Sequence, residues 1–420
     1  MARFSTLFIL IIVVYSTSTT ATSAKNGDGE GLLSCLLSSG LINVTSISSS
    51  TSEFYNSHTT WVGDSCAKRR AQLRGALLHV RRALRPHRFA QAQQNNSGRV
   101  CHTVGSGGHI AGGGLSFLSR KYGLAADNVL DALLINASGK VMNKNTIGED
   151  VFWAVRSGGD GSWGVLSVLK TGADNVTEAV HRWQYVGPQM EEDIFMRVQT
   201  FTIKVNNSTT ISASFHGIYV GRQPELLTKI GKIFPELGMV AADCKQKKWI
   251  ETIGNFDTTN VSQLTNRYFT VKIFFKIKSD FGKTPLPKPA LRGLWSTMKE
   301  EVNAKVLFSP LGGIMNRIPS TALPFPQRKG TLFEIQYKVS WTNRSEDDHY
   351  IEWMRKLYKY MERDVSHSPR AAYVNYLDLD LGNAINRSAS VEEARAWGER
   401  YFHHNYDRLV KAKTQVDRKN

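Results

Sequence analysis

The stretch RKYGLAADNVLDALLINASGKV, residues 120–141, decides how the fold of this chain is interpreted. It contains the short apolar run NVLDALLI at 128–135, which lies between glycine and polar residues that favour turns. A run of this length between turn signals predicts a buried strand. The run VLSVLK at 165–170 has the same character. Short buried strands separated by glycine-rich loops are typical of a nucleotide site in an α+β protein.

Three segments further along alternate apolar and polar residues. They are TISASFHGIYV at 210–220, FTVKIFFKIK at 269–278 and TLFEIQYKVSW at 331–341. A period of two predicts half-buried strands of one antiparallel sheet. In the third segment Glu334, Gln336 and Lys338 share one face, and the apolar side chains share the other.

Helices are expected beside this sheet. Residues 347–365 carry one apolar stripe, formed by Ile351, Met354, Leu357, Tyr358 and Met361. A last helix is expected to begin after Ser390, because Glu393 three residues later completes a capping box, and to carry residues 397–413.

The first 24 residues have the pattern of a secretory signal peptide: Arg3, an apolar run and small residues at the end. A membrane anchor at the N-terminus is the alternative. No later stretch approaches the roughly 18 apolar residues of a spanning helix. Secretion is also indicated by the density of N-x-S/T sequons, which begin at Asn43, Asn95, Asn136, Asn175, Asn206, Asn207, Asn260, Asn343 and Asn386.

The chain is basic, with 53 Lys and Arg against 36 Asp and Glu, a formal charge of +17. This charge suits an anionic cell wall or membrane surface, whereas a secreted glycoprotein rarely meets nucleic acid. Residues 67–94 hold much of the excess, and three interpretations stay open: a nucleic-acid or heparin patch, a solvated helix face, or a segment foreign to the original reading frame. Four cysteines are too few for a disulfide scaffold, and we expect one bridge between Cys35 and Cys66.

The segment GRVCHTVGSGGHIAGGG, residues 98–114, places a cysteine at the start of a glycine cluster. Glycines let backbone N–H groups approach a diphosphate closely, although a structural turn explains them too. The cluster matches neither the dinucleotide fingerprint nor a P-loop, so its pattern supports neither NAD(P) nor ATP. No His/Cys/carboxylate cluster has metal-ligand spacing; the nearest, His403-His404, lies on an expected helix.

These blocks, followed by GEDVFWAVRSGGDGSWGVL at 148–166, resemble the berberine bridge enzyme-like family of secreted plant FAD oxidases of the vanillyl-alcohol-oxidase type. The resemblance also covers 32–45, 234–240, 324–330, 375–382 and 412–417, and it fails between about residues 50 and 99. It implies an α+β protein with a PCMH-type FAD-binding domain and a substrate domain built on a large antiparallel sheet flanked by helices. The expected division is a signal peptide at 1–24, an FAD domain at 25–173 with an atypical part at 50–99, a substrate domain at 174–372, and a segment at 373–420 that returns to the FAD domain.

By this resemblance the sulfur of Cys101 is bonded to the flavin ring, although His102 follows it here instead of proline. A buried free thiol is the alternative. Val104 matches a small residue that leaves room for dioxygen, which favours an oxidase. His109 is not taken as the family's second covalent link, because that histidine belongs to an earlier block that this chain lacks. The implied FAD site comprises Cys101, Thr103, Val104, Gly105, Gly107, Gly108, His109, Gly112, Gly113, Gly114, Asn128, Gly164 and Tyr376.

The resemblance also marks catalytic candidates. Tyr376 matches a tyrosine that some relatives use as a base, and it is the first candidate for the base here; a core tyrosine with a satisfied hydroxyl is the alternative. Gln336 stands where the berberine bridge enzyme has a glutamate base. Glu334 replaces a lysine of the alcohol-oxidising relatives, and Leu115 replaces their active-site tyrosine. A polar strand face turned to solvent is the alternative for Glu334 and Gln336.

The predicted function is that of a secreted FAD-dependent oxidase. It would oxidise an alcohol, sugar hemiacetal or amine carbon of a small molecule, such as an alkaloid, monolignol or carbohydrate, and reduce dioxygen to hydrogen peroxide. The alternative is a truncated, non-catalytic glycoprotein of the same family that no longer binds FAD stably.

Overall fold

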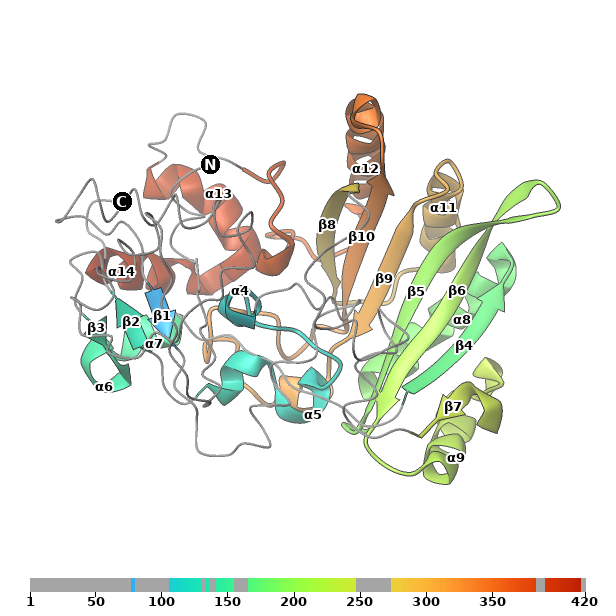
Figure 1. The fold of residues 1–420 in the computed structure, drawn as a ribbon, viewed down its shortest axis with the longest axis horizontal. Coiled ribbons are helices and arrows are strands. Elements are labelled where there is room, and N and C mark those ends of the chain that lie inside the picture. Colours follow the sequence, from blue (N-terminus) through green and yellow to red (C-terminus); the bar gives the residue numbers. More distant parts are fainter. Residues whose placement is uncertain are drawn as a thin grey trace, which may run out of the picture.

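The computed structural model describes residues 77–79, 106–129, 133–135, 141–154, 165–246, 273–382 and 390–416. Within these ranges a lobe built on a large sheet lies beside a lobe of short helices and a small sheet (Figure 1). The expected α+β class is confirmed. The predictions for the signal peptide, the Cys35–Cys66 bridge, Cys101, Thr103, Val104, Gly105 and Gly164 lie outside the described residues.

Among the described residues, the large sheet has seven strands in the order β7-β4-β6-β5-β9-β10-β8, and neighbouring strands are antiparallel. The predicted strands at 165–170, 210–220, 269–278 and 331–341 all belong to it, although the third begins only at Phe274 within the described residues. β4 therefore pairs within this sheet although it precedes residue 174. The strands are β4 (Val165–Thr171), β5 (Ile194–Val205), β6 (Ser208–Tyr219), β7 (Cys244–Lys245), β8 (Phe274–Gly282), β9 (Lys305–Pro310) and β10 (Phe333–Trp341).

Helices cover one face of the sheet and close its hydrophobic core (Figure 1). They are α8 (Ala173–Val186), α9 (Gln223–Ile233), α11 (Lys288–Met298) and α12 (Asp347–Met361). The predicted stripe of α12 is confirmed, since Met354, Leu357, Tyr358 and Met361 are buried and Ile351 packs beside them. Each large apolar side chain buried here stabilises the fold by about 1.5–3 kcal/mol. The alternate strand residues face away from these helices, toward the second lobe.

The second lobe combines early and late parts of the chain. Its core joins Ile110, Phe152 and Trp153 to Tyr401 and Tyr406 near the C-terminus. Its elements are β1 (Leu77–His79), α4 (Ser106–Ala111), α5 (Ser119–Tyr122), η1 (Ala125–Asn128), β2 (Leu133–Ile135), β3 (Val141–Met142), α6 (Lys144–Ile147), α7 (Glu149–Ala154), α13 (Val391–Phe402), η9 (His403–Asn405) and α14 (Tyr406–Val416).

Short 3-10 turns complete the described chain. They are η2 (Gly187–Gln189), η3 (Pro235–Leu237), η4 (Ala241–Asp243), η6 (Gly313–Asn316), η7 (Arg344–Glu346) and η8 (Val374–Tyr376). Among the described residues, no helix combines the length and the apolar character that crossing a bilayer would require.

Two expectations about local structure differ in part from the structure. Within the described residues, the strand predicted at 128–135 is present as β2, whereas Asn128 belongs to the 3-10 turn η1, which Asp127 stabilises by accepting the backbone N–H of Leu124 at 2.8 Å. The helix that begins after Ser390 has the predicted capping box, but it ends at Phe402 instead of continuing through 413. His403 takes a positive φ of 51°, and the side-chain amide of Asn405 donates to backbone carbonyls of residues 320–324. These tertiary bonds break the helical periodicity.

Arg120 joins the two lobes. It is fully buried on α5 and donates to the carbonyls of Ile194 at 3.1 Å, Pro188 at 2.8 Å, Leu311 and Met190. The chain can approach this closely because Gly312 has a φ of +93° and no Cβ, which would lie 2.1 Å from the Pro188 oxygen.

Candidate functional site

A row of polar side chains crosses the sheet on the face turned away from the helices. Glu334 on β10 lies opposite Ser309 on β9, and Arg197 on β5 lies opposite His216 on β6. Arg197 joins the two pairs, because its Nε and Nη2 donate to Ser309 Oγ at 3.0 and 2.8 Å. Residues directly opposite one another in antiparallel strands share a face, so the row spans four neighbouring strands. We call His216, Arg197, Ser309 and Glu334 the polar row.

The polar row is shielded from water by the second lobe. Arg197, Ser309 and Glu334 are at most 4% exposed, and His216 is half-buried. The Phe117 ring lies 5.0 Å from the Arg197 guanidinium carbon and meets the Phe195 ring edge to face at 4.9 Å. The aromatic contact fixes the guanidinium in a site of low polarity.

The glycine segment and the C-terminal part of the chain meet beside this row. The Tyr373 hydroxyl accepts the Leu115 backbone N–H at 2.9 Å and the Asn375 amide at 2.8 Å. The same amide donates to the His109 carbonyl at 3.0 Å. The ring of Tyr376 packs edge-on against Tyr373 at 5.1 Å. Tyr373 itself is anchored to the sheet, because its backbone N–H donates to Ser279 Oγ at 2.8 Å.

The charges in this site depend on burial. Burial raises the pKa of Glu334 to about 7, against the opposing effects of the Arg197 charge and a hydrogen bond from Ser309. Burial lowers the pKa of His109 to about 4. Burial, assisted by the Arg197 charge, also lowers the pKa of His216 to about 4. At neutral pH both histidines are therefore uncharged, and Glu334 is close to half ionised.

Three buried atoms of the site have no hydrogen-bond partner among the described residues. They are His109 Nε2, Arg197 Nη1 and Glu334 Oε1. A buried polar atom left without a partner costs about 1–3 kcal/mol. The polar row thus leaves one donor and one acceptor unpartnered, and the glycine segment leaves an imidazole nitrogen unpartnered, which are groups that a polar ligand can satisfy.

Most of the predicted site residues that the structure describes are buried or half-buried. Glu334 is 1% exposed and Gln336 is 8% exposed, so the alternative of a strand face turned to solvent was wrong. Tyr376 is half-buried beside the core, and Leu115 is buried. Gly107 and Gly108 lie in helix α4 rather than in an open loop.

The remaining glycines and Asn128 have structural contacts. Gly113 and Gly114 have φ values of +107° and +65°, which turn the chain out of α4. A Cβ on Gly112 would lie 1.9 Å from the side-chain oxygen of Asn375, so this glycine packs on protein. The Asn128 amide donates to the carbonyls of Tyr122 at 3.0 Å and Leu124 at 2.9 Å and holds the turn.

Sequence reasoning missed Arg197, Ser309, His216 and Tyr373. The one available signal was Arg197, the single charged residue in the apolar first half of IFMRVQTFTIKV. A charge in a buried strand needs a partner, which marks the position as one to examine.

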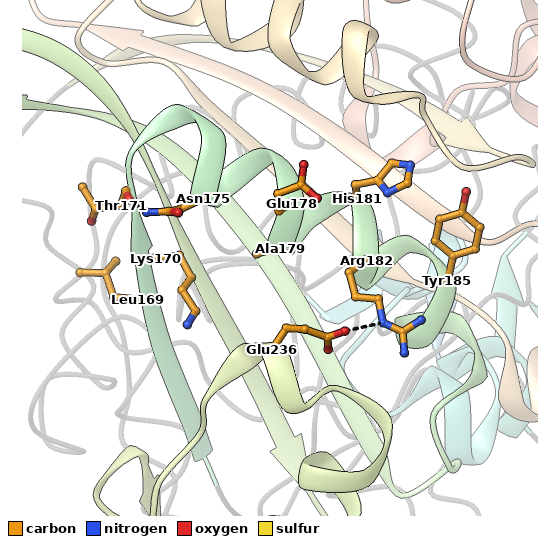
Figure 2. A pocket seen from close by; sticks show the side chains of 10 residues that line it. All are labelled: Leu169, Lys170, Thr171, Asn175, Glu178, Ala179, His181, Arg182, Tyr185 and Glu236. Atoms are coloured by element: carbon orange, nitrogen blue, oxygen red, sulfur yellow. Dashed lines mark hydrogen bonds and ion pairs between the residues drawn. The ribbon is translucent and has the colours of Figure 1, made fainter.

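A second depression lies away from the polar row, between β4, α8 and η3. It is a groove of about 780 Å³ (Figure 2). Its lining includes Glu178, His181, Arg182 and Tyr185 from α8, and Arg182 Nε pairs with Glu236 Oε1 at 3.3 Å (Figure 2). Its ionic lining is exposed and lacks unpartnered buried atoms, so we assign the chemistry to the polar row.

Within the described ranges, no group of three or more His, Cys, Asp or Glu side chains is placed to hold a metal ion. His404, one of the two neighbouring histidines, instead lies with Nε2 3.2 Å from Ser320 Oγ.

Comparison with known proteins decides the family. The family model described as "Berberine and berberine like" matches residues 372–420. Berberine bridge enzyme-like D-1 of Nicotiana tabacum is 40% identical over 405 residues, which cover 86% of this chain and 69% of that protein. This chain belongs to the berberine bridge enzyme-like family. The resemblance to this family that the sequence motifs indicated is therefore confirmed.

Other members agree. Berberine bridge enzyme-like D-2 of Nicotiana tabacum is 45% identical over 359 residues, which cover 76% of this chain and 63% of the relative. The solved structure of berberine bridge enzyme from Eschscholzia californica is 38% identical with a TM-score of 0.71, and the match covers 76% of this chain and 69% of the other. The chain thus spans 63–69% of the length of the two curated relatives described here.

Members of the berberine bridge enzyme-like family are FAD-linked oxidoreductases, and FAD is accordingly the cofactor to test against the site. The residues present fit it. His109 offers a buried, uncharged imidazole nitrogen, and the polar row offers one donor and one acceptor that have no partner among the described residues.

Proposed function

We propose that this protein is a secreted FAD-dependent oxidase that oxidises a small-molecule alcohol, sugar hemiacetal or amine. The proposal is carried by one observation: a buried carboxyl group, Glu334, has an oxygen without a partner among the described residues and a pKa near neutrality, close to Tyr373, which binds the end of the glycine segment. A general base works best with a pKa near the pH at which it operates. FAD, when bound, supplies the acceptor of the substrate hydride and delivers the electrons to dioxygen, giving hydrogen peroxide.

The residues of this chain divide the remaining tasks. Cys101 would tether FAD, and His109 would contact it from the glycine segment, next to Gly112, Gly113 and Gly114. Gln336 lies one step from Glu334 on the same strand face and can orient a substrate hydroxyl or amine. Phe117 and Phe195 keep water from the polar row, which strengthens every electrostatic interaction there.

The candidates for the proton acceptor are the three catalytic residues predicted from the sequence, Glu334, Gln336 and Tyr376. Gln336 cannot accept a proton at physiological pH, because an amide has no basic nitrogen. Glu334 and Tyr376 therefore remain as the bases.

Secretion is part of the proposal. The sequon asparagines Asn175, Asn206, Asn207 and Asn343 are all exposed, which is the placement that attached glycans need. The formal charge of +17 supports association with an anionic cell wall or membrane surface.

The first experiment is expression in a secretory eukaryotic host, followed by acid precipitation and a visible spectrum of the pellet. We expect a yellow pellet, because a covalent flavin survives denaturation, and a colourless pellet from Cys101→Ala. Cys244→Ala is the matched control, since Cys244 is a half-buried free thiol of the sheet lobe, and its pellet should stay yellow.

A wild-type pellet without colour, with no FAD retained by the native protein, would overturn the proposal. It would favour the alternative of a family member that has kept the fold without the cofactor.

A further inference from the structure

The hydrogen bonds of Ser309 have a fixed direction. Arginine has donors and no acceptor, so both bonds from Arg197 must use lone pairs of the Ser309 oxygen. A hydroxyl has two lone pairs and one hydrogen, so the hydrogen of Ser309 has to point to a different group. Glu334 lies directly opposite on the next strand, and the hydroxyl hydrogen-bonds to its carboxyl group.

The direction of these bonds affects whether the carboxyl group of Glu334 is ionised. Its buried Oε1 has no partner among the described residues, which leaves Oε2 as the oxygen available to the Ser309 hydrogen. A donated hydrogen bond favours the ionised carboxylate, and so does the positive charge of Arg197 two strands away. Burial acts in the opposite direction. At neutral pH the carboxyl group is therefore close to half ionised, and its Oε1 has no partner among the described residues.

We propose that Glu334 is the base that accepts the substrate proton on Oε1, and that Ser309 and Arg197 are positioning residues that orient it and favour its ionised form. This assignment rests on the proposed function, which supplies FAD as the oxidant. The substrate would lose its proton to Oε1, forming the O–H bond of a neutral carboxylic acid, and bound FAD would supply the two-electron oxidant that takes the substrate hydride.

The other groups near Glu334 do not replace it. The Tyr373 hydroxyl already accepts two N–H donors, and burial raises its pKa above the ordinary value. His216 lies beyond Arg197 and is uncharged at neutral pH. From β8, the residue opposite Glu334 is Phe281, which is apolar. The competing base is Tyr376, which lies within electrostatic reach of Arg197.

A titration without any catalytic turnover tests the positioning. Infrared spectra of the full chain and of its Glu334→Gln variant are recorded as a function of pH. Their difference isolates the band of the protonated Glu334 carboxyl group, and its intensity gives the titration midpoint. In Ser309→Ala the midpoint should rise by about one unit, because the carboxylate loses a donated hydrogen bond. Ser309→Thr keeps the hydroxyl and should restore the wild-type midpoint.

The matched control is Ser212→Ala. Ser212 is a fully buried serine of the same sheet, but its hydroxyl donates to the Lys170 carbonyl, so this change should leave the midpoint in place. An unchanged midpoint in Ser309→Ala, or an equal shift in Ser212→Ala, would overturn the assignment. Because the infrared titration needs no flavin, it tests the positioning of Glu334 even if the protein does not bind FAD.

The catalytic part is tested with the FAD-loaded protein. A substrate is first identified by the hydrogen peroxide that its oxidation releases, and kcat/KM is then measured against pH. In Ser309→Ala the acidic limb of this pH profile should shift to higher pH by the same amount as the infrared midpoint. Glu334→Gln should lower kcat by about 100-fold or more, the usual contribution of a general base. If the limb instead disappears in Tyr376→Phe and persists in Glu334→Gln, Tyr376 is the base and the proposal is wrong.

Discussion

At the scale of single residues, Glu334 links stability to pH in an unusual direction. Its folded-state pKa of about 7 lies above the ordinary value near 4.3, so the folded state binds the proton more tightly than the unfolded state. Its contribution to stability is therefore fully present below about pH 4 and is lost as the pH rises toward 7. The loss is on the order of 4 kcal/mol, since one pKa unit corresponds to about 1.4 kcal/mol.

Thermal unfolding between pH 4 and 8 measures this effect. Glu334→Gln should remove the decline, so that the difference in Tm between variant and wild type grows as the pH rises. Glu178→Gln, an exposed carboxylate of α8, is the control and should leave the pH dependence almost as it is. Parallel Tm curves for Glu334→Gln and wild type would show that the carboxyl group titrates normally.

The sequence predicted Glu334 but not its partners, and the reason is physical. Alternation within β10 separates the two faces of one strand, which is local information. Arg197 and Ser309 are 112 positions apart, and only the register of β5 against β9 brings them together. That register depends on the packing of both faces, which no single strand encodes.

At the scale of secondary-structure elements, buried ion pairs hold the segment that carries Tyr376. Asp378 is 4% exposed and binds Lys276 at 2.7 Å and Lys278 at 2.5 Å on β8. Asp378→Asn should lower the free energy of unfolding by about 3 kcal/mol, because it leaves a buried ammonium group with less compensation. Glu352→Gln, which breaks an exposed pair with Arg355 on α12, should cost less than about 1 kcal/mol.

Chemical denaturation of the two variants tests this contrast. Equal costs would mean that Asp378 contributes no more than a surface charge does. From the sequence, NYLDLDLG could be recognised only as a block that resembles the family. Nothing in the block indicates that Asp378 pairs with lysines about 100 positions earlier in the chain. In the same way, the capping box of Ser390 was predictable because it is local, whereas the break at His403 depends on the distant contacts of Asn405.

At the scale of the whole molecule, the site exists only where the two lobes meet, so the contact between them controls it. Arg120 donates from the second lobe to four carbonyls of the sheet lobe, and Phe117, three residues earlier, covers Arg197. A lysine has a single ammonium group and cannot reach carbonyls spread around a planar guanidinium. Arg120→Lys should therefore lower stability by several kcal/mol, about 1–3 kcal/mol for each carbonyl left without a donor.

The loss should also open the lobe contact before the lobes themselves unfold. Hydrogen exchange should accelerate in residues 116–122 and 311–316, while the amides of β5 and β6, in the middle of the sheet, keep their protection. Lys121→Met, at the neighbouring position, is the control and should leave both regions protected. If Arg120→Lys instead accelerates exchange equally in all strands, the two lobes unfold as one cooperative unit, and the polar row is then lost only together with the whole fold.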